Sequence, residues 1–99
     1  MSKEPDRVIE LGENSSGHSE WIELYIAVNG GRLRAVEKDS MPVYNESTYV
    51  YGFEGEEISF LNGRKSCSGA GKSRSVSPSD EVDELVREGF GELRQEVGV

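Results

Sequence analysis

Apolar and polar residues alternate most regularly over residues 21–28, which read WIELYIAV. In an extended chain successive side chains point to opposite faces, so every second residue from Ile22 to Val28 forms one all-aliphatic face. That face has to be buried, while Trp21 and Tyr25 point to the other side of the strand. The pattern predicts a strand with one face in the core.

A tight turn follows this strand at Asn29–Gly31, because Asn and Gly adopt positive φ angles at little cost. The return segment 32–37 alternates again, with Leu33 and Ala35 on one side and arginines on the other. The two segments therefore predict an antiparallel β-hairpin with one face in the core and the other in water.

Four further stretches have weaker strand patterns, and turn-forming residues separate them. In the best of them, Tyr49 and Tyr51 share a face and are expected to extend an aromatic patch formed by Trp21 and Tyr25. The stretches are residues 7–11, 48–53, 58–61 and 64–68, with turns expected at 54–57 and at Asn62-Gly63. The hairpin, residues 48–53 and 58–61, and one further edge strand at 64–68 predict a meander of four to five antiparallel strands, to which 7–11 is the weakest addition.

The pattern changes to a helical period over residues 77–97. Ser77 followed by Pro78 is typical of an N-cap and a first helical residue, since proline lacks an amide hydrogen that has no partner there. Gly89 weakens the helix by about 1 kcal/mol relative to alanine and favours a break near it. The apolar residues at helical spacing are Val82, Leu85, Val86, Phe90, Leu93 and Val97. We expect an amphipathic helix packed across the sheet, so that the whole chain of 99 residues forms one α+β domain with a loose segment at 1–7.

Acidic residues outnumber basic ones, 19 to 11, which gives a formal net charge of −8. Nucleic acids and anionic membranes attract cations, so this balance argues against direct binding to either and permits a larger protein with a basic surface as partner. A high net charge also keeps a small domain soluble without any further role. The single Cys67 excludes an internal disulfide. Neither a signal peptide nor an apolar run of about 20 residues is present, so we expect a soluble cytoplasmic protein that is a monomer or a small homo-oligomer.

Acidic side chains gather in two places. Four glutamates fall within a narrow arc of the expected helix at about 100° per residue: Glu81, Glu84, Glu88 and Glu92. Three more lie together in the turn at 54–57: Glu54, Glu56 and Glu57. Most charged helix surfaces are simply solvated. The four helix glutamates also fit a negative ridge that docks into a basic groove of a partner, where the phosphates of a nucleic acid would otherwise lie. Trp21 and Tyr25 are further candidate contacts, because Trp and Tyr are enriched at binding hot spots.

The segment 62–79 is rich in Gly and Ser and contains Gly71-Lys72-Ser73, the end of a phosphate-binding loop motif. The first glycine of that motif would fall at Ser66, and Pro78 places the helix start too late to hold the anion, so nucleotide hydrolysis is not expected. The segment holds no acids and four bases: Arg64, Lys65, Lys72 and Arg74. It predicts either a flexible connector or a loop that contacts an anionic ligand.

The chain offers little for catalysis or metal binding. One histidine, His18, and one cysteine, Cys67, cannot form a structural zinc site, and their spacing indicates no nucleophile–base pair. We therefore expect no catalytic residue, no bound metal and no cofactor.

These features favour a small non-enzymatic protein-interaction module. In length, charge and lack of a catalytic set, the chain resembles small acidic inhibitors made by phages and other mobile elements, such as DNA-mimic and anti-CRISPR proteins. That resemblance implies an inhibitor that occupies a basic, nucleic-acid-binding surface of a larger protein. Two alternatives stay open: a small-ligand or phosphate-binding domain that uses residues 62–79, and a structural subunit of a larger assembly that makes its contacts through Trp21 and the tyrosines.

Overall fold

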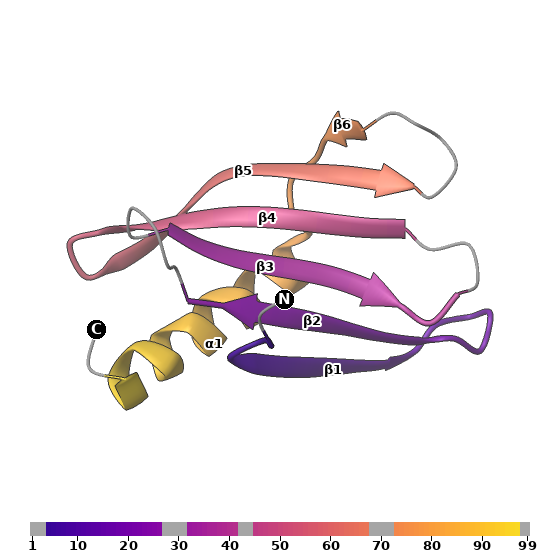
Figure 1. Ribbon diagram of the computed structural model, residues 1–99, viewed down its shortest axis with the longest axis horizontal. Helices are drawn as coiled ribbons and strands as arrows, with labels where there is room; N and C mark the ends of the chain where they lie inside the picture. Colours follow the sequence, from indigo (N-terminus) through magenta and orange to yellow (C-terminus); the bar gives the residue numbers. More distant parts are fainter. Residues whose placement is uncertain (1–3, 27–31, 42–44, 68–72, 98–99) are drawn as a thin grey trace.

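The computed structural model describes residues 4–26, 32–41, 45–67 and 73–97. They form six strands followed by one helix, which confirms the α+β fold that the sequence predicts (Figure 1). The elements are β1 (Arg7–Glu13), β2 (Ser19–Tyr25), β3 (Arg32–Asp39), β4 (Asn45–Glu54), β5 (Glu57–Cys67), β6 (Ser73–Ser75) and α1 (Asp80–Val97).

The strands form one antiparallel sheet in chain order, so each strand pairs with its neighbours along the chain. This is the predicted meander, with six strands in place of the four to five expected. β2 and β3 pair as the hairpin pattern predicts, with Leu24 opposite Ala35. The turn at Asn29–Gly31 lies outside the described residues.

The structure corrects the prediction for the first half of the segment 62–79. No turn forms at Asn62-Gly63, because β5 runs as one strand from Glu57 to Cys67. Val50 pairs with Asn62 while the next residue of β4 pairs with Phe60, so Leu61 between them bulges out of the pairing. Half of the expected loop is therefore sheet, and its residues 68–72, with Lys72 among them, lie outside the described part of the chain.

Gly63 has a packing role that its place in an Asn-Gly pair does not reveal. A Cβ atom there would lie 2.5 Å from the carbonyl oxygen of Val76 and 2.9 Å from a ring carbon of Tyr49. The Val76 amide donates a hydrogen bond to the Gly63 carbonyl at 3.1 Å. A glycine inside a strand often marks such a close backbone approach, and here it lets the chain cross from β6 towards the helix.

The N-terminal segment 1–7, expected to be loose, ends inside the sheet. The Asp6 amide donates to the Leu24 carbonyl at 2.8 Å. The Asp6 carboxylate accepts a hydrogen bond from the Ile26 amide, also at 2.8 Å. Arg7 then opens β1 opposite Leu24. These bonds extend the pairing of the first two strands by one residue beyond β1.

The helix α1 begins at Asp80 instead of at Ser77. Its cap is Ser79, whose hydroxyl accepts a hydrogen bond from the Val82 amide at 3.2 Å and whose carbonyl accepts one from the Asp83 amide at 2.8 Å. The helix runs through Gly89 without the expected break. None of the described helical residues belongs to a helix long and apolar enough to cross a bilayer.

One face of the sheet packs against α1 and forms the core. The buried residues of this core are Ile22, Leu24, Leu33, Ala35, Tyr49, Tyr51 and Ile58 from the sheet and Val82, Val86, Phe90 and Leu93 from the helix. Tyr49 and Tyr51 are 4% and 0% exposed, so the prediction that they extend the patch of Trp21 and Tyr25 is wrong. Those two side chains lie on the opposite face, because they alternate with Ile22 and Leu24 along β2.

A polar network fixes the helix to the sheet beside this core. The Tyr51 hydroxyl donates to the Asp83 carboxylate at 2.7 Å, and Arg87 donates to the other Asp83 oxygen at 2.7 Å and to the Ile58 carbonyl. Burial, together with the hydrogen bond to Asp83, raises the pKa of Tyr51 above its usual value. The helix lies against the end of the sheet with the β4–β5 turn and leaves the end with the β1–β2 turn uncovered (Figure 1).

Candidate functional site

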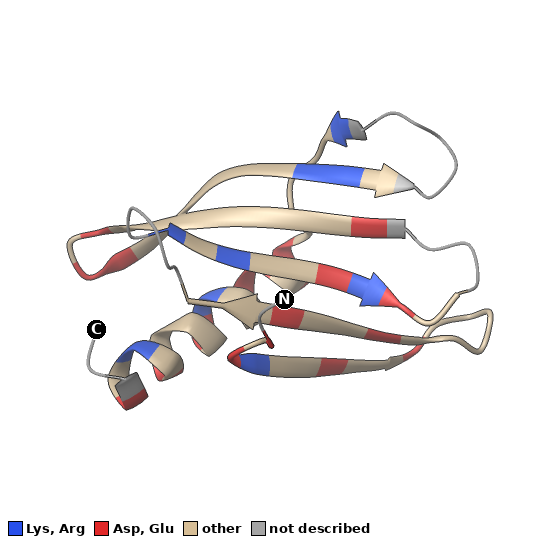
Figure 2. Ribbon diagram, viewed as in Figure 1, with Lys and Arg blue, Asp and Glu red and all other residues tan. Residues whose placement is uncertain are grey.

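The outward side of α1 carries three exposed glutamates: Glu81, Glu84 and Glu88. Helical spacing places them away from Val82 and Val86, which are buried against the sheet. None of the three forms an ion pair with another described residue. They leave a negative surface along the helix, where Figure 2 shows acidic positions on successive turns.

Glu92, the fourth glutamate of the predicted stripe, has a different environment. Its carboxylate lies 2.6 Å from Arg7 of β1, and the same guanidinium reaches Glu96 at 3.0 Å. An exposed pair of this kind contributes at most about 1 kcal/mol to folding, but it neutralises much of the negative charge at this end of the helix. The negative surface is therefore centred on the first half of α1.

The second acidic cluster, Glu54, Glu56 and Glu57, lies at the β4–β5 turn near the other side of the helix. Arg94 stands between this turn and the helix: its guanidinium lies 4.6 Å from the ring centre of Phe53 and donates to the Glu56 carbonyl at 3.4 Å. A basic side chain thus separates the two acidic clusters, which form two surfaces instead of one.

On the sheet face away from the helix, Trp21 and Tyr25 both donate to Glu23. The indole nitrogen of Trp21 lies 2.9 Å from one carboxylate oxygen, and the Tyr25 hydroxyl lies 2.8 Å from the other. Lys38 also approaches Glu23 at 3.2 Å and links it to Glu46 at 3.6 Å. Because the polar atoms of both aromatic side chains are already bonded, these rings can offer a partner mainly their apolar surfaces.

The ionisation of this network follows from its bonds. Burial raises the pKa of the Glu23 carboxyl, but the hydrogen bonds from Trp21, Tyr25 and Lys38 outweigh burial and leave that pKa below its usual value. Burial lowers the pKa of Lys38, and the bond to Glu23 and its charge reverse the effect, so the pKa is raised. Burial and the bond to Glu23 raise the pKa of Tyr25. The network is therefore a charged pair, Glu23 and Lys38, at neutral pH.

The structure divides the bases predicted for the loop between the two faces of the sheet. Lys65 pairs with Arg74 across β5 and β6, and both are on the helix side. Arg64 is the neighbour of Lys65 along β5, so it lies on the opposite face. Of the three predicted bases that lie in the described part of the chain, only Lys65 and Arg74 share a face of the sheet.

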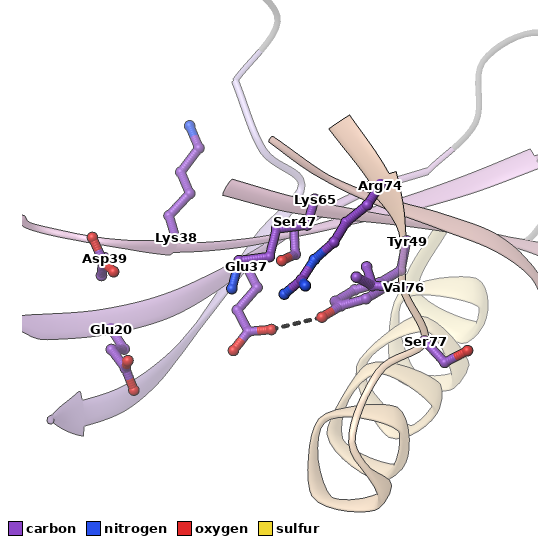
Figure 3. Close-up of a pocket in the computed structure, with 10 residues that line it drawn as sticks. All are labelled: Glu20, Glu37, Lys38, Asp39, Ser47, Tyr49, Lys65, Arg74, Val76 and Ser77. Atoms are coloured by element: carbon purple, nitrogen blue, oxygen red, sulfur yellow. Dashed lines mark hydrogen bonds between the residues drawn. The ribbon is translucent and has the colours of Figure 1, made fainter. Parts of the chain in front are cut away.

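This pair borders a polar hollow of about 300 Å³ on the uncovered end of the helix side. Its lining residues are Glu20, Glu37, Lys38, Asp39, Ser47, Tyr49, Lys65, Arg74, Val76 and Ser77. In Figure 3, Lys65 and Arg74 point from one side towards Glu37, while Lys38 points away from the others. The Tyr49 hydroxyl donates to Glu37 at 2.9 Å, and burial together with this bond raises the pKa of Tyr49 to about 12.

No sequence motif marks the acids of this hollow, although the alternation along β3 contains two of them. On β3 the positions of one face are Leu33, Ala35, Glu37 and Asp39, apolar at first and acidic afterwards. The change marks where the core ends. Its meaning depends on the neighbouring strands, whose register the sequence alone does not supply.

In the part of the chain that the structure describes, no group of three or more His, Cys, Asp or Glu side chains is placed to hold a metal ion. No model of a known protein family matches this chain, and neither a curated protein nor a solved structure is significantly similar to it.

Proposed function

We propose that this protein is a non-enzymatic interaction module that binds a basic surface of a larger protein through the outward side of α1. In its most specific form it is an inhibitor that occupies a nucleic-acid-binding surface. The observation that supports the proposal is the exposure of Glu81, Glu84 and Glu88 without an ion pair to any described residue.

The charge and the rigidity of α1 both favour binding through this surface. Carboxylates four residues apart on a helix recur about every 6 Å along its axis, and they repel one another in the free protein. A groove that neutralises a row of phosphates relieves that repulsion as it binds the row of carboxylates. Complementary charge also accelerates association and sharpens the choice of partner. The helix is fixed to the sheet by Phe90, Leu93 and the Asp83 network, so little ordering is needed on binding.

The test compares two triple variants. The first is Glu81→Gln/Glu84→Gln/Glu88→Gln, which removes three charges from the outward side of α1. The control is Glu4→Gln/Glu10→Gln/Glu13→Gln, which removes the same charge from exposed positions in and before β1. Each is used to capture nucleic-acid-binding proteins at low and high salt, and the captured protein is then competed with duplex DNA.

We expect the helix variant to lose binding by about tenfold or more and to have a weaker salt dependence, while the control keeps most of both. Duplex DNA should displace the unmodified protein. Equal losses in the two variants would mean that net charge alone is responsible. Unchanged binding and salt dependence in the helix variant would contradict the proposal.

A further inference from the structure

The hollow on the uncovered end of the sheet is built around one row of residues that pair across four strands. Glu37 of β3 pairs with Ser47 of β4, Ser47 with Lys65 of β5, and Lys65 with Arg74 of β6. Neighbouring strands lie about 4.8 Å apart, so the acid at one end of the row is about 10 Å from Lys65 and about 14 Å from Arg74 at the backbone. In this row the small Ser47 stands between Glu37 and Lys65.

Two more carboxylates extend the acidic side of the hollow. Glu20 and Asp39 form the next pair of residues across β2 and β3, and with Glu37 they are half-buried. The Tyr49 hydroxyl holds one oxygen of Glu37. The hollow therefore has three carboxylates at one end and two cations at the other.

Opposite charges so close together usually form ion pairs, but these do not. No ion pair joins Glu20, Glu37 or Asp39 to either cation in the part of the chain that the structure describes. Lys38 does not neutralise these acids, because its side chain points away from them (Figure 3). It pairs instead with Glu23 and Glu46 on the other face of the sheet.

The connection from β6 to α1 keeps the hollow open. Val76 and Ser77 form its wall on the helix side, and Val76 is held over the sheet by its bond to Gly63. The buried ring of Tyr49 supports the same wall. A site of this size with a few convergent polar groups matches the lower end of the range for small-molecule pockets.

From this arrangement we propose that the hollow binds a small molecule with a cationic group at one end and a carboxylate at the other, of the class of the free basic amino acids. The cationic group lies among Glu20, Glu37 and Asp39, and the carboxylate is bound by Lys65 and Arg74. Three acids against two bases leave the hollow one negative charge, which a ligand of net charge +1 balances. The backbones that carry the two ends are two to three strand spacings apart, and Lys65 and Arg74 reach from their side towards Glu37 (Figure 3). The ligand therefore carries its cationic group and its carboxylate at opposite ends of one side chain.

The probes are L-arginine and two analogues that each lack one of its charged groups. Agmatine has no carboxylate, and L-citrulline has no cationic side chain. Binding is measured on the intact protein by ¹H–¹⁵N chemical shifts, with inorganic phosphate as a further probe for simple anion binding. We expect L-arginine to shift the resonances of Ser47, Lys65 and Ser77, and each analogue to bind about tenfold more weakly.

Two variants locate the site. Glu37→Gln keeps the acceptor for Tyr49 but removes the charge, and Lys65→Gln removes a cation at the other end. We expect each to weaken L-arginine binding by about tenfold. The control is Glu84→Gln on the helix, which should bind L-arginine normally.

Agmatine binding as tight as that of L-arginine, shifts outside the hollow, or no saturable shift at all would each overturn the inference. So would phosphate shifting the same resonances while L-arginine does not. The inference does not rest on the proposed function: the glutamate variants of α1 test one surface and Glu37→Gln the other, so either can fail alone.

Discussion

The helix-bearing face of the sheet has two ends of opposite character. At one end, Leu33 and Ala35 of β3 are 1% and 0% exposed beneath α1. At the other, Glu37 and Asp39 of the same strand and the same face border a polar hollow. Along this face of β3, the side chains are apolar where α1 covers the sheet and acidic at the next position beyond it. The apolar character of these positions therefore follows the cover by the helix and not the sheet itself.

The boundary between the two ends passes through Gly63. The row on the covered side is Leu24, Ala35, Tyr49 and Gly63, and the next row is Ile22, Glu37, Ser47 and Lys65. The backbone of Val76 crosses at Gly63 on its way to the helix. The β6–α1 connection therefore borders the core on one side and forms a wall of the hollow on the other.

The largest expected contrast is between a core residue of the covered end and a lining residue of the uncovered end. Phe90→Ala should lower the free energy of unfolding by about 3–5 kcal/mol, because it leaves a cavity against Tyr51. Arg74→Ala should change it by no more than about 0.5 kcal/mol, because Arg74 is exposed. Urea unfolding measures both free energies. If the two variants lost comparable amounts of unfolding free energy, the two ends of the sheet would not differ as described.

Gly63→Ala tests the boundary itself. We expect a loss of about 2–3 kcal/mol, because the added methyl group meets the Val76 carbonyl, a backbone atom that cannot move without shifting the β6–α1 connection. A matched control is Gly52→Ala on the neighbouring strand, where the nearest atom is the end of the exposed Leu61 side chain at 3.1 Å. Thermal unfolding of the two variants should separate clearly, and a tolerated Gly63→Ala would show that the crossing is not fixed.

Alkaline pH should weaken the covered end. The pKa of Tyr49 rises from 10.0 to about 12 on folding, so the unfolded chain ionises first as pH increases. The stabilisation is complete below pH 10 and is lost as pH rises towards 12, by up to about 2 kcal/mol. Unfolding free energy against pH should be flatter in the double variant Tyr49→Phe/Tyr51→Phe. An equally steep decline would mean that other groups cause it.

The smallest expected effects are opposite in sign and concern two glycines of α1. Gly89→Ala adds a methyl group 2.5 Å from the buried Leu24 side chain, so crowding outweighs the gain in helix propensity and costs about 1 kcal/mol. Gly91→Ala meets nothing within 4 Å and should stabilise the protein by about 0.5–1 kcal/mol. Melting temperatures should move in opposite directions; a shift of the same sign in both would place the helix differently on the sheet.

Much of the fold follows from local patterns. The alternation in 21–28 and 32–37 correctly predicts the β2–β3 pairing, and Ile22, Leu24, Leu33 and Ala35 are buried as that pattern requires. The helical spacing of Val82, Val86, Phe90 and Leu93 likewise identifies the face of α1 that meets the sheet. These predictions succeed because burial acts on each element separately.

The remaining features depend on contacts between distant segments. Asn62-Gly63 has the composition of a turn, yet position 63 needs a glycine because the backbone carbonyl of Val76 lies only 2.5 Å from where a Cβ atom would be. Ser77 and Ser79 are both suitable caps, and only the packing of the helix selects Ser79. The hollow needs the register of β2 to β6 before Glu37 and Lys65 can be recognised as neighbours of one site.

The position of α1 after all six strands has a consequence for biosynthesis. A ribosome makes the whole sheet before the element that shields its apolar side, so Leu24, Tyr51 and Ile58 face solvent until the helix emerges. At that stage the nascent chain exposes an apolar surface to solvent, and such intermediates aggregate readily. The acidic side chains of α1 then appear on the same element that covers this apolar face, so closing the core also adds negative charge to the surface.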